Sequence, residues 1–174
     1  SSVYGDGAYC KENDSLRPTT LHSLLKASCE KIVELFCIEN DIEYTISRVF
    51  NMYGGEDRFS VISKIIDSAI SKKVLVVVNN GRSIRDFVHV NDVVSCYEAI
   101  LSLETPKIIN IANGAGTSIS TILNSLNYRG IVVDTKAVKK IEIETSVANI
   151  DRLKKIIDTS KFLNVVDFIE NRLK

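Results

Sequence analysis

The fold is decided by residues 81–93, which read Gly-Arg-Ser-Ile-Arg-Asp-Phe-Val-His-Val-Asn-Asp-Val. Residues 84–88 include β-branched and aromatic side chains, and this composition predicts a short strand. Asn91 or Asp92 is a suitable N-cap for a helix that continues to about residue 103. The segment therefore predicts a strand that passes almost directly into a helix, which is the repeating step of α/β proteins.

The sequence before this segment continues the alternation of helix and strand. Residues 1–17 contain several turn-forming residues and predict a loop that follows the end of a strand. Pro18 with Thr19 or Thr20 begins a long helix that ends near residue 40. The next expected elements are a strand at 44–49, a turn at 51–55, a helix at 59–71, a strand at 74–78 and a hairpin-type turn at 79–81.

The sequence after the segment adds a strand at 107–112, a helix from Ser118, strands at 131–133 and 140–147, and helices at 150–158 and 164–173. Only the strands at 44–49 and 107–112 have the character of buried central strands, and two strands do not make a covered parallel sheet. The chain also lacks an initial Met. We therefore expect an α/β fold whose first parallel strands lie upstream of Ser1.

The composition excludes two classes of partner. Lys and Arg number 22, Asp and Glu also number 22, and the isoelectric point is about 6.7, so nothing attracts nucleic acid or an anionic membrane. No apolar run approaches the roughly 20 residues of a membrane span. The four cysteines lack CxxC spacing, and His22 and His89 are far apart. We expect reduced thiols, a cytoplasmic protein and no metal site.

Several motifs, taken in order along the chain, resemble one family. The most specific is the string Arg-Asp-Phe-Val-His-Val-x-Asp at 85–92, and the other matches are Ser2 to Gly5, His22 with Lys26 and Glu30, Arg48 with Asn51, Tyr53 and Gly54, and Asn110 to Gly114. The whole set resembles the extended short-chain dehydrogenase/reductase family of nucleotide-sugar epimerases and dehydratases. The resemblance extends over nearly the whole chain.

The resemblance implies a Rossmann-like fold with a small substrate-binding lobe. Residues of about 1–50 and 84–112 would belong to the Rossmann core, and those of about 51–83 and 113–174 to the lobe. It also implies an NAD or NADP cofactor. Residues upstream of Ser1 would mainly bind this cofactor, because the glycine-rich pattern of a dinucleotide-binding loop is absent from residues 1–174. Members of the family usually dimerise through the helix that carries the lysine, so a homodimer is expected.

The catalytic residues implied by the resemblance are a tyrosine and a lysine four positions later. Lys26 occupies the lysine position, where it would hold the cofactor ribose, and His22 occupies the tyrosine position. A phenol needs a nearby cation to become a base at neutral pH, whereas a neutral imidazole is already a base and a nearby ammonium weakens it. Two hypotheses follow: His22 is an alternative acid/base, or the protein is a catalytically inactive nucleotide-sugar-binding or structural relative.

The substrate side of the resemblance rests on four positions. Asn51 would donate to the diphosphate, and the forked guanidinium of Arg85 would bind a phosphate oxygen. Lys139 or Lys140 and Glu142 are the candidates for further phosphate and ribose contacts. We expect Arg85 and Asn51 to converge on one pyrophosphate-sized cleft, and we expect structural roles for Asp86, His89 and Asp92.

Overall fold

The computed structural model describes every residue from 1 to 174. Its helices are α1 (Leu21–Glu39), α2 (Val61–Ser71), α3 (Val90–Ser102), α4 (Ile119–Tyr128) and α5 (Val165–Leu173). Its strands are β1 (Gly7–Cys10), β2 (Ile46–Val49), β3 (Asn51–Tyr53), β4 (Leu75–Val78), β5 (Ile84–His89), β6 (Ile108–Ile111), β7 (Gly116–Ser118), β8 (Thr135–Val138) and β9 (Thr145–Ala148). Short 3-10 turns are η1 (Ser2–Tyr4), η2 (Asn79–Gly81), η3 (Leu153–Lys155) and η4 (Thr159–Lys161).

The strands form mainly parallel ladders. The largest sheet has the order β1-β9-β5-β3, and the short β7 pairs antiparallel with β5. Two further parallel pairs are β2 with β6 and β4 with β8. The strands predicted near 44–49 and 107–112 are thus confirmed, and they pair with each other from Ile46 opposite Ile108 to Val49 opposite Ile111.

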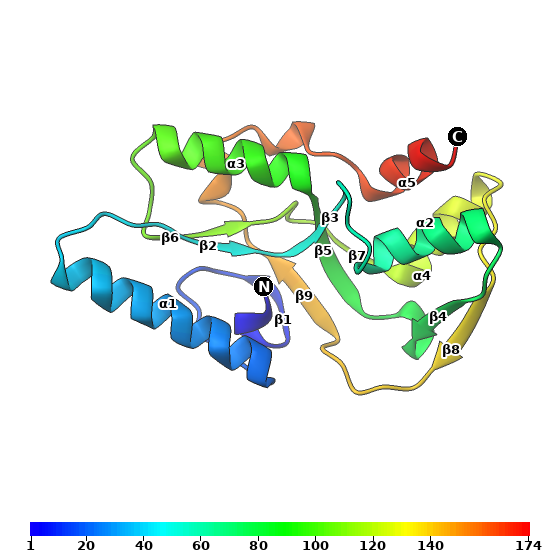
Figure 1. Ribbon diagram of the computed structural model, residues 1–174, viewed down its shortest axis with the longest axis horizontal. Helices are drawn as coiled ribbons and strands as arrows, with labels where there is room; N and C mark the ends of the chain where they lie inside the picture. Colours follow the sequence, from blue (N-terminus) through cyan, green and yellow to red (C-terminus); the bar gives the residue numbers. More distant parts are fainter.

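The helices divide into two groups around these strands (Figure 1). Helices α1 and α3 lie on opposite sides of the β2–β6 pair, and α2, α4 and α5 gather beside β4 and β8. Each group has its own apolar core. Strand β5 serves both cores, because successive side chains of a strand alternate in direction: Val88 is buried in the first core and Phe87 in the second.

The structure corrects two local predictions next to this central strand. The turn predicted at 51–55 is wrong, because Asn51–Tyr53 form β3 and Asn51 lies opposite Phe87 of β5. The predicted caps Asn91 and Asp92 are also wrong, because His89 caps α3 and its Nδ1 accepts the backbone N–H of Asn91 at 3.2 Å. Histidine is not among the preferred N-cap residues, so capping preferences did not predict His89 at this position.

Other corrections concern strands whose partners are distant in the sequence. The hairpin-type turn predicted at 79–81 is wrong: these residues form η2, and β4 pairs with β8 rather than β5. The strand predicted at 131–133 is displaced to β8, and only the last part of 140–147 is a strand, β9. Residues 1–17 contain η1 and β1, and the helix predicted at 150–158 is reduced to η3. None of the helices combines the length and the apolar character needed to cross a membrane.

Candidate functional site

Asp86 of strand β5 holds neighbouring backbone segments against this strand, which also carries Arg85. The buried carboxylate accepts backbone N–H groups from Asn113, Gly114 and Ala148 at 2.9, 3.0 and 3.2 Å. Burial raises the pKa of Asp86 to about 6, although these three hydrogen bonds favour the charged form. The contacts confirm the structural role predicted for Asp86, since they join the segment after β6 and strand β9 to β5.

Arg85 contacts Glu142 near the beginning of strand β5. One guanidinium nitrogen, Nη2, lies 3.2 Å from Glu142 Oε2 and donates to the carbonyl of Ile143 at 2.6 Å. The other, Nη1, donates to the carbonyls of Ile84 and Glu144 at 2.9 and 3.4 Å. Two residues that the sequence assigned to one site, 57 positions apart, are therefore in contact.

Asn51 lies on the neighbouring strand, on the same face of the sheet as Arg85. Its partner in the ladder is Phe87, which is two residues after Arg85, so the pleat directs all three side chains to one side. The Asn51 amide donates to the carbonyl of Asp86 at 3.2 Å. Neither Asn51 nor Arg85 lines the two hollows described below. Their convergence on a shared cleft stays a prediction.

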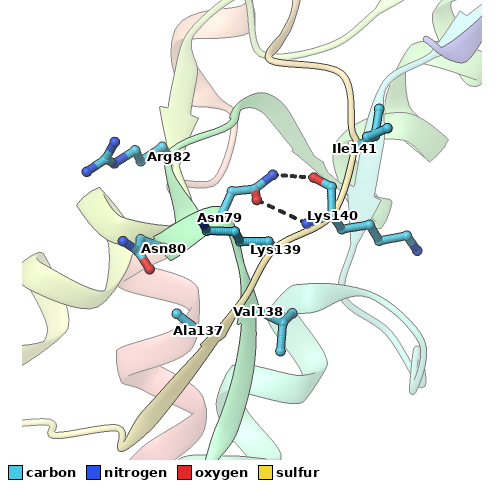
Figure 2. A pocket seen from close by; sticks show the side chains of 8 residues that line it. All are labelled: Asn79, Asn80, Arg82, Ala137, Val138, Lys139, Lys140 and Ile141. Carbon is cyan, nitrogen blue, oxygen red and sulfur yellow. Dashed lines mark hydrogen bonds between the residues drawn. The ribbon is translucent and has the colours of Figure 1, made fainter.

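A cationic hollow lies beside the Arg85–Glu142 contact, between η2 and the segment that follows β8 (Figure 2). Its volume is about 690 Å³. Arg82, Lys139 and Lys140 line it, and none of the three has a carboxylate partner within 4.0 Å. Unpaired cations around a concave surface suit an anionic ligand. The other lining residues are Asn79, Asn80, Ala137, Val138 and Ile141.

Sequence reasoning missed Asn79 and Arg82 as lining residues of this hollow. Arg82 directly follows η2, and Asn79 begins it. The only available signal was a cation beside a predicted turn, which is more often an exposed surface residue. Lys139 and Lys140, by contrast, were both candidates, and both are exposed in the wall of the hollow.

His22 and Lys26 lie in a second hollow, which faces the first turns of α1. Thr20 begins this helix with a capping box, in which its side chain accepts the N–H of Ser23 and the Ser23 side chain accepts the N–H of Thr20. The hollow has a volume of about 530 Å³, and the residues from Ser1 to Val3 line it together with both side chains. The structure therefore brings His22 and Lys26 together on one exposed helix face, as their spacing of four predicts.

A buried polar network anchors α1 next to this hollow. Arg48 of β2 donates to both carboxylate oxygens of Glu30, at 2.7 to 3.1 Å, and its Nη1 donates to Tyr4 Oη at 2.8 Å. The Tyr4 hydroxyl in turn donates to Asn110 Oδ1 at 2.7 Å. The Arg48 side chain is only 4% exposed. This ion pair holds the helix that carries His22 and Lys26 against β2 and β6.

The sequence matches proteins of known families. Residues 1–112 match the family model described as NAD dependent epimerase/dehydratase family. The chain is 29% identical, over 170 residues, to GDP-6-deoxy-D-talose 4-dehydrogenase of Aggregatibacter actinomycetemcomitans, and 30% identical, over 125 residues, to CDP-abequose synthase of Salmonella typhimurium. These alignments cover 95% and 68% of this chain. The chain spans about half the length of these curated relatives, 56% of the first and 41% of the second.

Solved structures share the fold. UDP-glucuronic acid 4-epimerase from Bacillus cereus, in complex with UDP-glucuronic acid and NAD, superposes with a TM-score of 0.89 at 23% identity, over 99% of this chain and 58% of that one. MoeE5 in complex with UDP-glucuronic acid and NAD gives 0.86 at 21% identity, over 99% and 60%. The arrangement is thus a Rossmann-like α/β fold, as expected. Together with the family match over residues 1–112, it shows that the chain belongs to the NAD-dependent epimerase/dehydratase family of extended short-chain dehydrogenases/reductases.

Proposed function

We propose that the protein is an NAD(P)-dependent nucleotide-sugar epimerase or dehydratase that transiently oxidises a sugar hydroxyl. The observation that carries this proposal is the contact between Arg85 and Glu142 beside a hollow with three unpaired cations. A nucleoside diphosphate offers the complementary chemistry, since it combines phosphate oxygens for the cations with ribose hydroxyls for a carboxylate.

Each substrate-side residue has a role in this proposal. Arg85 supplies a positive charge for a phosphate oxygen, and Lys139 adds a second positive charge. Glu142 accepts hydrogen bonds from the ribose hydroxyls, and it already orients Arg85 at 3.2 Å. Asn51, on the same face of the sheet, donates its amide to the diphosphate. The substrate-binding lobe is the part assigned to residues 51–83 and 113–174.

The cofactor side depends on Lys26. Its ammonium has no carboxylate within 4.0 Å and lines the hollow with Ser1 to Val3, so it is free to hold the ribose hydroxyls of NAD or NADP. NAD or NADP, when bound, would supply the acceptor for a hydride from the sugar carbon. His22, one helical turn before Lys26, removes the proton from the sugar hydroxyl through an imidazole nitrogen.

A second candidate function is supported by one observation, the histidine at position 22. The family resemblance places a tyrosine at this position, and the imidazole ring is shorter than a phenol and places its nitrogen elsewhere. In this alternative the protein is a catalytically inactive relative that binds a nucleotide sugar or serves as a structural partner. The two candidates share the substrate site and differ only in turnover.

The proposal includes a homodimer in the cytoplasm. Of the residues of α1, only Ser23 and Cys37 are buried, while Leu21, Leu25, Ile32 and Phe36 are 74%, 57%, 65% and 58% exposed. Apolar side chains exposed on this scale are typical of an interaction surface. All four cysteines are free thiols, which fits a reducing compartment.

The test is turnover by the purified protein with NAD or NADP and a panel of UDP-, GDP-, CDP- and dTDP-sugars. Transient nicotinamide reduction or a converted sugar with any donor supports the enzyme, and His22→Tyr should then change its rate. Binding of a nucleotide sugar without turnover supports the inactive relative. If no nucleotide sugar binds at all, both candidates fail.

A further inference from the structure

Asn79 links the two walls of the cationic hollow. Its Nδ2 donates to the carbonyl of Lys140 at 2.5 Å, and its Oδ1 accepts the N–H of Lys140 at 3.1 Å (Figure 2). A side-chain amide that exchanges both bonds with one residue acts like a backbone peptide in a strand ladder. The β4–β8 ladder ends at Val78 opposite Val138, so the Asn79 side chain extends the pairing beyond the point where the backbone turns away.

The same amide also orients the Arg85–Glu142 pair. Nδ2 of Asn79 lies 3.2 Å from Glu142 Oε1, while the other carboxylate oxygen, Oε2, lies 3.2 Å from Arg85 Nη2. One residue thus fixes the backbone that follows Lys139 and the carboxylate that faces Arg85. The half-buried position of Glu142 leaves these contacts partly accessible to solvent.

The backbone conformation alone does not account for an asparagine here. Asn79 has a φ of 46°, and Asn80 and Gly81 follow with 57° and 68°. Glycine adopts this left-handed region without cost, and asparagine tolerates it at a small cost. A glycine would therefore satisfy the turn, and what it would lose is the link from Asn79 to Lys140 and Glu142.

We propose that Asn79 is a positioning residue of the nucleotide-diphosphate site, which holds Lys139, Lys140 and Glu142 in place before the ligand arrives. This inference rests on the proposed function. A pre-organised site binds more tightly because less conformational entropy is lost on binding. Asn79 belongs to the hollow at η2 and not to the hollow of α1 that contains His22 and Lys26, so it acts on binding rather than on proton transfer.

The test compares Asn79→Gly with a matched control, Lys72→Gly. Lys72 also has a left-handed backbone, with φ 55°, but it ends α2 and is exposed outside the hollow. Both changes relieve a left-handed backbone cost, which is smaller for asparagine than for lysine, and only the first removes a cross-link. Isothermal titration with UDP, GDP, CDP and dTDP measures affinity, thermal unfolding measures stability, and hydrogen exchange follows the amide of Lys140.

We expect Asn79→Gly to weaken binding of the preferred diphosphate about tenfold, because the wall of the hollow would then be ordered only when the ligand binds. In Asn79→Gly the Lys140 amide should exchange faster, and KM should rise with little change in kcat. Lys72→Gly should match the wild type in diphosphate affinity, in exchange at Lys140 and in KM. Equal affinity of Asn79→Gly and wild type overturns the inference and leaves the proposed function intact. Unchanged exchange at Lys140 overturns it too. A wild-type protein that binds none of the four diphosphates overturns both proposals.

Discussion

The two hollows differ in the burial of the ion pair that lies next to each of them. The hollow of His22 and Lys26 depends on a buried ion pair, in which the side chains of Arg48 and Glu30 are 4% and 15% exposed. The cationic hollow lies beside a contact between strand β5 and the segment that precedes β9, in which the side chains of Arg85 and Glu142 are 19% and 25% exposed. The first is part of the core between α1, β2 and β6, and the second holds together segments at the surface.

This difference predicts which property of the protein a substitution in each region should change. Removing one partner of a buried pair leaves an uncompensated charge in the interior, which destabilises the fold. A partly exposed pair is compensated by water, so its loss costs little stability and changes mainly local geometry. We therefore expect the α1 region to respond in folding free energy and the cationic hollow to respond in ligand affinity.

The largest expected effect is the loss of the Arg48 guanidinium. Arg48→Ala should lower the free energy of unfolding by about 3–5 kcal/mol, because Glu30 and the Tyr4 hydroxyl lose their buried partner. Chemical denaturation measures it. The control is Arg129→Ala, which removes a surface pair with Asp167 and should leave the denaturation midpoint nearly unchanged. Equal midpoints for the two variants would remove the contrast between the regions.

The next effect separates chemistry from folding in the α1 region. His22 is exposed and makes none of the hydrogen bonds of the network, so His22→Ala should leave the unfolding transition in place. Under the proposed function it should lower kcat about 100-fold or more, since it removes the base. Steady-state kinetics with the active donor provides the measurement. A kcat equal to that of the wild type would move the base to another residue.

A smaller effect is expected from Arg85→Lys, beside the cationic hollow. Lysine keeps the positive charge but cannot donate to Glu142 and to several carbonyls at once in the fixed fork geometry of arginine. We expect KM for the nucleotide sugar to rise about tenfold while kcat and the melting temperature change little. A large fall in melting temperature would instead show that this pair supports the fold as Arg48 does.

The smallest effect is a pH dependence at Asp86, which lies between the two regions. Its pKa is raised to about 6 by burial, so the folded protein holds this proton more tightly than the unfolded chain. The resulting stabilisation is complete below about pH 4, where an ordinary carboxyl is protonated, and is lost as the pH rises through 6. Unfolding at pH 5 and at pH 7 should differ by about 1 kcal/mol more in wild type than in Asp86→Asn. Equal pH dependence in the two proteins would mean that folding does not raise the pKa of Asp86.

Several elements of the fold follow from local signals in the sequence. The helix at 21–39, the parallel strands near 44–49 and 107–112 and the shared face of His22 and Lys26 follow from apolar periodicity, capping and spacing. The same is true of Arg85 as a candidate, because the string around it is contiguous. Lys139 or Lys140 and Glu142 follow instead from the family resemblance, which places a basic residue and then an acid ahead of the last strand.

Contacts between distant segments depend instead on how the whole chain folds. Asn79 and Lys140 are 61 residues apart, and Arg85 and Glu142 are 57 apart. Their contacts depend on the pairing of β4 with β8 and of β5 with β9, and strand pairing is set by closure of the whole core rather than by the propensity of either segment. For the same reason β1 and β3 were predicted as loop and turn: their residues have weak strand propensity, and they become strands because β9 and β5 offer them partners.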